Sequence, residues 1–531
     1  MSQTPGSRDI EAFNVVATEL SFRRAAERLS MDQSALSRRI KQLEDCLGYQ
    51  LIRRTTREVS LTAAGEIFHE RTRLFGTQID QAVQAARVAA LLRWALRQSP
   101  LYREIAADRA SDSLQLSDFP VMTKRRLMDR FDDWVTDPAL RLAALREFVA
   151  DRDRIGDDYL GRYQVWESSG STGEPGLFVQ DSQALSVYDA LEALRRPVLQ
   201  PLRRCLDPWG ATERLAFVGA TTGHFASTAS IRRLCRISPW MSRTVCSLSF
   251  LMPMHELVAA LNHHRPTVLA TYPSAALVLA AEAKAGRLRV PLQEVWTGGE
   301  ALTPSMRRFI AASFGCPVSQ SYGASEFLAM GSECHLGHMH LNSDWLVLEP
   351  VDEHHRPVPP GAIGHTTLLT NLANRVQPLI RYDLGDRVRL LSVPCACGSA
   401  LPLIEVEGRV DDMLALDNDH GQPVSLLPLA LTTVLEDDAG VFDFQLQRRG
   451  PRSLWLCVAD DGPPGAAALV RALAALRPFL IAQGLGGVTL GGCFGDGGVP
   501  GRSGKRARVV AEVPRRGRRH AAAPRGVTQP A

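Results

Sequence analysis

Apolar residues recur at helical spacing over the first hundred residues and are separated by short polar breaks. Ile10, Phe13, Val16 and Leu20 follow one another at intervals of three or four, the spacing that places side chains on one face of an α-helix. A second apolar stripe runs over 33–47, after a polar turn. The pattern therefore predicts short helices packed around a small core.

The helix expected over 33–47 carries polar and basic side chains opposite its apolar stripe. Between Leu36 and Arg57 six basic residues stand against two acids. Residues 54–61 predict a small hairpin, and Thr62 is expected to cap a long helix that runs to about Leu92. Such a basic face is typical of a surface that meets phosphates. A helical bundle with a solvated basic face is the alternative.

Farther along the chain, short strand-like runs adjoin polar, glycine-rich segments. The run 168–176 precedes the strand-like 177–179, the segment 297–300 follows 294–296, and 321–326 follows another short strand. Glycines let a backbone approach a polyphosphate closely, and hydroxyls add hydrogen-bond donors. We expect 168–176 to bind phosphate, with a flexible loop as the alternative. It does not fit the P-loop pattern, because Glu174 stands where a cation is expected.

Composition sets the domain count and the class of protein. A chain of 531 residues predicts about three domains at ~100 to 200 residues each. Apolar residues make up 45% and charged residues 22%, which excludes wholesale disorder. We expect a cytoplasmic protein, because there is no secretory h-region and no run of ~18 apolar residues. The ten cysteines then favour reduced thiols or a metal site over a disulfide framework. The basic tail over 511–531 is expected to be disordered.

The first 88 residues carry an ordered series of motifs: Ser21-Phe22, the Ala-Ala-Glu-Arg-Leu run 25–29, the Gln-to-Arg run 33–38 and the Leu-to-Gly run 61–65. This series resembles the DNA-binding domain of LysR-type transcriptional regulators. The resemblance implies a winged helix-turn-helix that binds double-stranded DNA, and a homodimer formed through the following linker helix. The residues it places on DNA are Gln33, Ser37, Arg38, Lys41, Arg53, Arg54 and Arg57.

The rest of the chain, from about 89 to 510, carries a second ordered series: 119–124, 166–176, 297–300, 321–326, 381–386, 407–412 and 501–506. The series resembles the adenylate-forming superfamily of acyl-CoA ligases, and most closely its phenylacetate-CoA ligase-like branch. The resemblance implies ATP, Mg²⁺ and coenzyme A as cofactors and acceptor, and a carboxylic acid, of the aryl or phenylacetate type, as substrate.

The same resemblance assigns roles to individual residues. Thr172, Glu326 and Lys505 would be catalytic, with Glu326 also binding Mg²⁺ and Lys505 reaching the acyl phosphate. Tyr322 would lie against adenine, Asp386 would accept hydrogen bonds from the ribose, and Asp411 would be the hinge of a mobile C-terminal domain. The nucleotide-binding set is Ser168, Ser169, Gly170, Ser171, Thr172, Gly173, Gly299, Glu300, Tyr322, Gly323, Ser325, Asp386 and Arg409. Glu174 departs from the superfamily, in which many members have Lys.

Two separated groups of metal-ligand residue types stand in the same region. Cys334, His338 and His340 come first, and Cys395 and Cys397 follow. Thiolates and imidazoles in this number suit tetrahedral zinc. Cys334, His340, Cys395 and Cys397 are the expected ligands, with free thiols as the alternative.

These patterns predict a multidomain protein without a membrane segment. The expected parts are a helix-turn-helix head and linker helix (1–88), a large α/β adenylate-forming domain (89–408), a small mobile α/β domain (409–510) and the tail (511–531). The expected function is activation of a carboxylic acid as its acyl-adenylate, with transfer to coenzyme A. The alternatives are a regulator that uses the ligase fold as a ligand sensor with little or no catalysis, and a fused head that never binds DNA.

Overall fold

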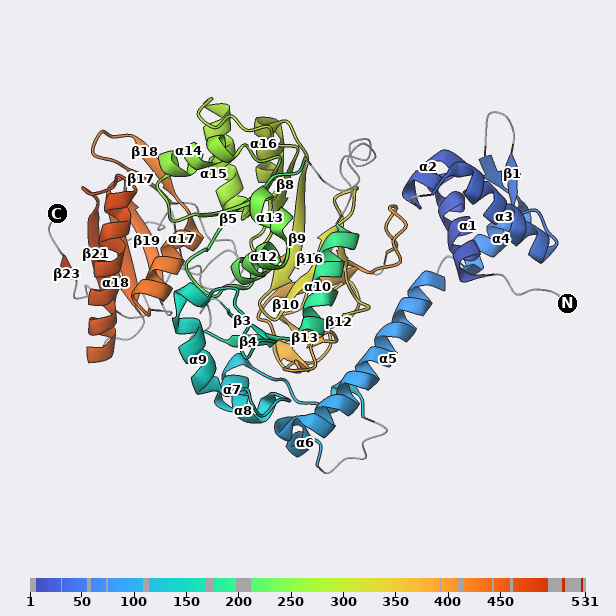
Figure 1. Cartoon of the computed structure of the whole chain (residues 1–531), viewed down its shortest axis with the longest axis horizontal. Helices are drawn as coiled ribbons and strands as arrows, with labels where there is room; N and C mark the ends of the chain where they lie inside the picture. Colours follow the sequence, from blue (N-terminus) through green and yellow to red (C-terminus); the bar gives the residue numbers. More distant parts are fainter. Residues whose placement is uncertain are drawn as a thin grey trace, which may run out of the picture.

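The structure of the chain is a computed structural model. It describes residues 6–29, 31–54, 59–72, 75–107, 114–168, 175–196, 212–391, 393–407, 414–441, 444–458, 462–494, 509–510 and 527–528. In Figure 1 a helical head and a small C-terminal domain lie at opposite ends of a large α/β body.

The head is a helix-turn-helix with a hairpin wing. Its elements are α1 (Ser7–Glu19), α2 (Phe22–Arg28), α3 (Gln33–Leu47), β1 (Ile52–Arg54), β2 (Val59–Leu61) and α4 (Ala63–Thr72). The Asp32 side chain caps α3 by accepting the Ala35 N–H at 2.8 Å, and Gly48 ends the helix with φ +73°. Phe13, Leu36 and Ile40 are fully buried in its core. The expected helices and wing are therefore present.

A long linker helix, α5 (Phe75–Gln98), joins the head to the body. Of the single helix expected from Thr62 to Leu92, the described residues form α4 and α5, residues 73 and 74 lie outside the described part, and α5 continues to Gln98. Leu91, Leu92 and Ala95 are buried in the core of the body, and the indole of Trp94 donates to the Arg375 carbonyl at 3.0 Å. The C-terminal half of α5 is thus part of the body, as Figure 1 shows.

The body is built on a mixed sheet. Among the described residues nine strands form it, in the order β15 (Arg387–Leu391), β16 (Leu403–Glu407), β11 (Met339–Leu341), β10 (Phe327–Glu333), β9 (Val318–Ala324), β8 (Glu294–Thr297), β7 (Val268–Thr271), β5 (Leu215–Gly219) and β6 (Val245–Ser249). Strands β6 to β9 are parallel, and β9 to β15 are antiparallel. The sheet therefore changes from parallel to antiparallel pairing at the hairpin β9–β10.

Helices cover the sheet and smaller elements complete the body. The helices are α6 (Pro100–Ile105), α7 (Lys124–Asp129), α8 (Phe131–Trp134), α9 (Leu142–Ala150), α10 (Ser182–Arg195), α12 (Ala226–Ile237), α13 (Pro239–Thr244), α14 (Met254–His264), α15 (Pro273–Lys284) and α16 (Pro304–Phe314). The further strands are β3 (Gln164–Glu167), β4 (Leu177–Gln180), β12 (Leu346–Val351), β13 (Thr366–Asn371) and β14 (Tyr382–Asp383). Helices α14, α15 and α16 pack on the parallel strands through one apolar cluster.

The C-terminal domain has its own core. Its elements are β17 (Leu414–Asp417), β18 (Pro423–Leu426), α17 (Pro428–Thr433), β19 (Phe444–Gly450), β20 (Ser453–Val458), α18 (Pro463–Ala482), β21 (Thr489–Phe494), β22 (Val509–Val510) and β23 (Val527–Thr528). Of the helices described, α18 alone has the length and apolar composition of a membrane span, which is weak evidence, because its Leu469, Leu473 and Leu476 are buried in this domain's core.

One pair of cysteines differs from the expectation of reduced thiols. Cys457 on β20 and Cys493 on β21 are joined by a disulfide, so the expectation is wrong for this pair. The two strands run parallel with these residues in register, which brings the Cα atoms to 4.6 Å, within the range that a disulfide spans. The expected multidomain fold, with a helical head followed by a large α/β domain, is confirmed.

Candidate functional site

A large cleft of about 2220 Å³ opens at the carboxyl ends of the parallel strands. Ligand sites of open α/β sheets lie at this edge. The cleft gathers every predicted nucleotide-site residue that falls within the described part of the chain: Ser168, Gly299, Glu300, Tyr322, Gly323, Ser325, Glu326 and Asp386 all line it. Segments more than two hundred residues apart in sequence therefore meet in one place.

The expected phosphate loop is the connection between strands β3 and β4, which pair antiparallel. At its neck the Ser168 N–H donates to the Gly176 carbonyl at 2.8 Å, and the Ser168 hydroxyl accepts the Gly176 N–H at 2.9 Å. The neck is fixed to the body because the Trp166 indole donates to the Ser325 carbonyl at 2.8 Å. The base of the loop thus lies directly beside the 321–326 motif.

Glu326, the expected magnesium ligand, lies in the turn between β9 and β10 and is almost fully buried. Its Oε1 accepts a hydrogen bond from the Tyr382 hydroxyl at 2.8 Å. Burial raises the pKa of this carboxyl, while the Tyr382 hydroxyl and the nearby Lys124 ammonium lower it. A positive ion would stabilise the ionised form in this position, because burial penalises an uncompensated charge.

Tyr322 and Asp386 face each other across the cleft. The Tyr322 hydroxyl donates to Asp386 Oδ2 at 2.9 Å, and burial raises the pKa of Tyr322 well above its ordinary value. Asp386 follows Gly385, which has φ +72°, a left-handed conformation that glycine adopts without strain. The phenol therefore positions the carboxylate that was expected to accept from a ribose.

Gly299 and Glu300 lie at the end of β8, with Gly299 at φ +78°. The Glu300 carboxylate accepts the Ser274 N–H at 2.9 Å and the Ser274 hydroxyl at 3.0 Å. This places the side chain at the first turn of α15, where negative charge is favourable. Glu300 thus shapes the wall of the cleft through a structural contact.

Lys124 is a cleft residue to which the sequence interpretation gave no role. It begins α7, and the bridge of Met122 to Tyr382 places it at the cleft, where it lines the wall. A Cβ built on Gly176 would lie 3.4 Å from Lys124 Cδ and 3.3 Å from Ser168 Oγ. Its ammonium also acts on Glu326. The only available signal was its place in the 119–124 segment, ahead of every phosphate motif.

Several predicted residues lie outside the described part of the chain. These are Arg57 of the wing, Ser169, Gly170, Ser171, Thr172, Gly173 and Glu174 of the phosphate loop, Arg409 and Asp411 of the hinge, and Lys505. Their roles stay predictions.

Side chains of the sheet and of helices α10 and α12 together line one part of the cleft, called the chamber below. Phe217 of β5 and Trp296 of β8 line it together with Ile231 of α12. Arg196 stacks on the Trp296 ring at 3.9 Å and pairs with Glu192.

His224 does not line the cleft. It is fully buried, its Nε2 lies 3.0 Å from the Asp151 carbonyl, and its ring lies 5.4 Å from that of Phe148. It is a loop histidine whose polar contact is structural.

The predicted metal ligands Cys334, His340, Cys395 and Cys397 form one cluster. Their ligand atoms all lie within 4.8 Å of one another. The two sulfurs of Cys334 and Cys395 are 3.9 Å apart, and Cys397 Sγ is 3.3 Å from His340 Nε2. Bonds of about 2.3 Å to a tetrahedral zinc would place sulfurs about 3.8 Å apart. Sulfur and nitrogen donors at this spacing fit zinc.

A second contact orients the histidine of this cluster. His340 Nδ1 lies 3.0 Å from the Leu401 carbonyl. Because a carbonyl only accepts, Nδ1 carries the proton and Nε2 is left for a metal. Burial lowers the pKa of His340, which favours the neutral form that ligates. His338 Nδ1 is 3.2 Å from Cys395 Sγ and is an additional imidazole at the edge of the cluster.

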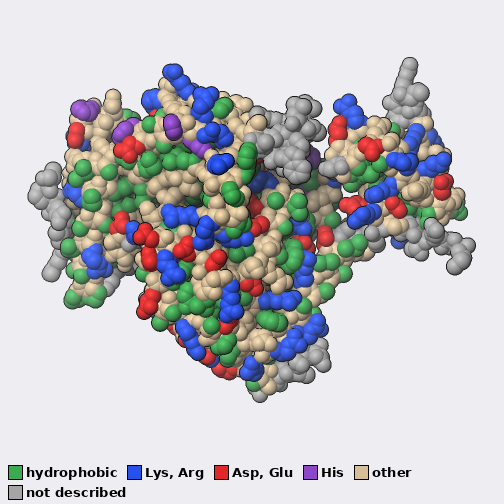
Figure 2. Space-filling view, in the orientation of Figure 1, with side chains coloured by type: hydrophobic (Ala, Val, Ile, Leu, Met, Phe, Trp, Pro, Cys, Tyr) green, Lys and Arg blue, Asp and Glu red, His purple; other side chains and the backbone are tan. Residues whose placement is uncertain are grey.

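The head exposes the predicted DNA-facing side chains. Gln33, Arg38 and Lys41 are exposed on α3, and Arg53 and Arg54 are exposed on β1. The Arg54 guanidinium lies 3.4 Å from the Ser37 hydroxyl, so wing and helix share one surface. Figure 2 shows Lys and Arg side chains grouped on the head. The arrangement suits a duplex groove flanked by phosphates.

Comparison with known proteins finds matches for two parts of the chain. Residues 7–66 match the bacterial regulatory helix-turn-helix proteins of the LysR family, and residues 168–371 match the AMP-binding enzymes.

The head is similar to transcriptional regulators of bacteria. It is 49% identical over 80 residues to the HTH-type transcriptional regulator AlsR of Bacillus subtilis (strain 168), which is 15% of this chain and 26% of the regulator. It is 59% identical over 58 residues to PgrR of Escherichia coli (strain K12), which is 11% of this chain and 19% of that regulator. The match thus spans about a quarter of the regulators' length or less.

Solved structures of ligases resemble the body more distantly. An open conformation of 2-hydroxyisobutyryl-CoA ligase in complex with 2-HIB-AMP and CoA aligns at 19% identity and a TM-score of 0.48, covering 82% of this chain and 91% of that one. The anthranilate CoA ligase AuaEII aligns at 16% identity and a TM-score of 0.34, covering 66% and 64%. The evidence for the body remains the motif series, the cleft and the match over 168–371. The chain joins a LysR-family helix-turn-helix DNA-binding domain to an adenylate-forming domain of the AMP-binding enzymes.

Proposed function

We propose that the body activates a carboxylic acid with ATP and passes the acyl group to coenzyme A, and that the head binds specific DNA. The observation that carries the enzymatic part is the meeting of Ser168, Glu326 and Asp386 in one cleft. In the first step a carboxylate oxygen would attack the α-phosphorus of ATP and pyrophosphate would leave. That step needs alignment and neutralisation of charge more than a protein nucleophile.

Each cleft residue would serve one part of the nucleotide. The loop 168–173, with Thr172, would bind the β- and γ-phosphates, and Glu326 would hold Mg²⁺, which prefers oxygen ligands. Asp386, already oriented by Tyr322, would accept from the ribose, with Arg409 beside it. Lys505 would reach the acyl phosphate, and Asp411 would be the hinge of the C-terminal domain.

The acid would be an aryl or phenylacetate-type acid. The chamber walls of Phe217 and Trp296 offer flat apolar surfaces that suit an aromatic ring. Arg196, stacked on Trp296, would meet a polar substituent.

We further propose that zinc occupies the Cys334, His340, Cys395 and Cys397 cluster as a structural ion. In a structural zinc site, four protein side chains typically fill all four coordination positions of the ion. We also propose that the chain is a cytoplasmic homodimer, with contacts through the N-terminal half of α5, where Ile79 is 41% exposed; the other half is buried in the body.

Acid-dependent release of pyrophosphate tests the enzymatic proposal. A panel of aryl and arylacetic acids is incubated with the full chain, ATP and Mg²⁺, followed by coenzyme A. We expect turnover with at least one acid, and loss of nearly all of it in Glu326→Gln, because the amide cannot offer a charged oxygen to the metal. Glu353→Gln, exposed on the body, is the control. No release with any acid, together with ligand-dependent DNA affinity, would favour the sensor function instead.

Lys124 is expected to supply the cation that Glu174 does not provide. Lys124→Met should lower kcat/KM for ATP on the order of 10-fold to 100-fold, the cost of one lost hydrogen bond to a charged group. Glu174→Lys in the Lys124→Met background should restore part of the loss. Lys284→Met, whose ammonium lies over Phe309, is the control. An unchanged kcat/KM for ATP in Lys124→Met would contradict this role.

The pH dependence of the reaction should report the ionisation of Glu326. Because the carboxylate binds the metal, activity should fall as pH falls through the raised pKa of Glu326. Tyr382→Phe removes a hydrogen bond that lowers this pKa, so the acid limb of the pH–rate profile should move to higher pH. Tyr159→Phe, outside the cleft, should leave the limb in place. A Tyr382→Phe limb that stays in place or moves to lower pH would speak against Glu326 as the titrating group.

Two variants of the head should distinguish contacts to DNA bases from contacts to DNA phosphates. On a duplex selected from a random library, Arg53→Ala should weaken binding to all sequences and reduce the slope of log K against log salt by about one. Gln33→Ala should cost about 1–3 kcal/mol on the selected duplex and relax the preference for one base. Arg141→Ala, on the body, is the control. Fluorescence anisotropy gives both quantities, and binding that is independent of salt and of Arg53 would mean that the head does not bind DNA.

A further inference from the structure

The zinc ligands lie on the part of the body that faces the head. Cys334 follows β10 and His340 lies on β11, while Cys395 and Cys397 lie on the loop 393–402 before β16. The cluster therefore fastens this loop to the β10–β11 hairpin. The loop also contacts the hairpin through His340 Nδ1 and the Leu401 carbonyl, and through the Leu341 N–H, which donates to the Pro402 carbonyl at 2.9 Å.

The residue after the last ligand contacts the DNA-binding head. Gly398 has φ +75°, and a Cβ built on it would lie 1.3 Å from Arg28 Nη2 and 2.2 Å from Arg28 Cζ. The guanidinium of Arg28 thus occupies the position in which a side chain at residue 398 would lie. Arg28 ends α2 and its Nη1 is 2.9 Å from Glu19 Oε1. Its side chain is only 16% exposed, so most of the guanidinium-bearing side chain is shielded from water.

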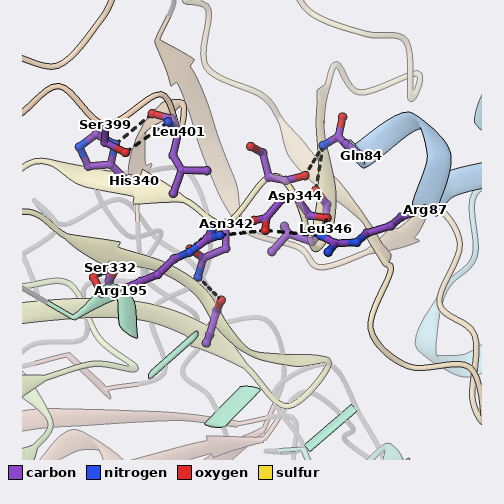
Figure 3. A network of polar contacts seen from close by, with 12 residues as sticks. Gln84, Arg87, Arg195, Ser332, His340, Asn342, Asp344, Leu346, Ser399 and Leu401 are labelled. Carbon is purple, nitrogen blue, oxygen red and sulfur yellow. Dashed lines mark hydrogen bonds and ion pairs between the residues drawn. The ribbon is translucent and has the colours of Figure 1, made fainter. Parts of the chain in front are cut away.

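The same hairpin also anchors the linker helix. Asn342 Oδ1, two residues after His340, accepts from Arg195 at 3.0 Å, and Arg195 pairs with Asp344 at 2.7 Å. Figure 3 shows Arg87 of α5 reaching the same turn, where it donates to the Asp344 carbonyl at 2.6 Å.

Gln84, one turn earlier on α5, extends this anchor. It donates to the Ser343 carbonyl at 2.6 Å and to the Leu346 carbonyl at 3.0 Å. Both supports of the head, the base of α5 and the Arg28 contact, therefore begin within a few residues of metal ligands.

From this placement we propose that metal bound by Cys334, His340, Cys395 and Cys397 fixes the orientation of the DNA-binding head by holding Gly398 against Arg28. The inference rests on the proposed zinc site and adds a regulatory role to it. Without the metal the loop loses its cross-links, and α2 loses the surface on which Arg28 lies. The contact uses α2 and leaves Gln33, Arg38 and Lys41 of α3 exposed, so a fixed head can still reach DNA.

The effect expected on DNA binding follows from preorganisation. A head held in one orientation loses less conformational freedom when it docks on a duplex than a loose one. Metal loss should therefore weaken specific binding by the full chain.

Hydrogen exchange of the full chain, before and after removal of zinc with a chelator, tests the inference. Elemental analysis first gives the zinc content, expected to be one ion per chain in the wild type and absent in Cys395→Ser/Cys397→Ser. Peptides that cover α2 should then exchange several-fold faster after chelation of the wild type, and equally fast in the double variant. Readdition of zinc should restore the slow exchange of the wild type alone.

Two arginine variants separate the contact from the metal. Arg28→Ala should keep its zinc, exchange fast at α2 from the start and no longer respond to chelation. Arg24→Ala is the matched control, because it also pairs with Glu19 from α2 but is 62% exposed; it should respond like the wild type. Absence of zinc from the wild type would remove both the site and the inference. Zinc that binds without changing exchange at α2, or an Arg28→Ala variant that still responds, would overturn the inference alone.

Discussion

The carboxylate of Glu326, buried at the turn between β9 and β10, is the constraint on which the cleft depends. Burial disfavours its charge, and the Tyr382 hydroxyl and the Lys124 ammonium oppose that effect. Lys124 precedes the phosphate loop in the sequence and Tyr382 follows it. The neck of the loop is fixed to the residue before Glu326, because the Trp166 indole donates a hydrogen bond to the Ser325 carbonyl. This geometry suits a metal–polyphosphate complex, because a metal ion at Glu326 would compensate the charge that burial disfavours.

The sequence predicted the cleft through its motifs and missed the contacts between them. Ser168, Tyr322 and Asp386 could be grouped in advance only through the motif series that resembles the adenylate-forming superfamily, because β3, which precedes Ser168, belongs to a separate two-stranded sheet. That Tyr322 donates to Asp386, or that Glu300 engages Ser274, could not be predicted, since local periodicity does not say which distant side chains meet. The same reason explains why the Cys457–Cys493 disulfide was unexpected.

The head and the body are connected more closely than a fusion of two domains requires. The C-terminal half of α5 is buried in the body, and Arg87 and Gln84 bond to the turn after β11. A helix-turn-helix pattern predicts the head and a linker helix, but not that the linker docks on its own body. The docking arises from residues of the adenylate-forming domain, such as Asp344 and Arg375, which no motif distinguishes.

The position of a bound nucleotide decides whether this cleft is where ATP binds. A crystal structure of the full chain with ATP and Mg²⁺ should place the phosphates beside Ser168 and Lys124, the metal on Glu326 and the ribose on Asp386. A nucleotide bound elsewhere on the molecule, or a cleft that stays empty at saturating ATP, would contradict the account.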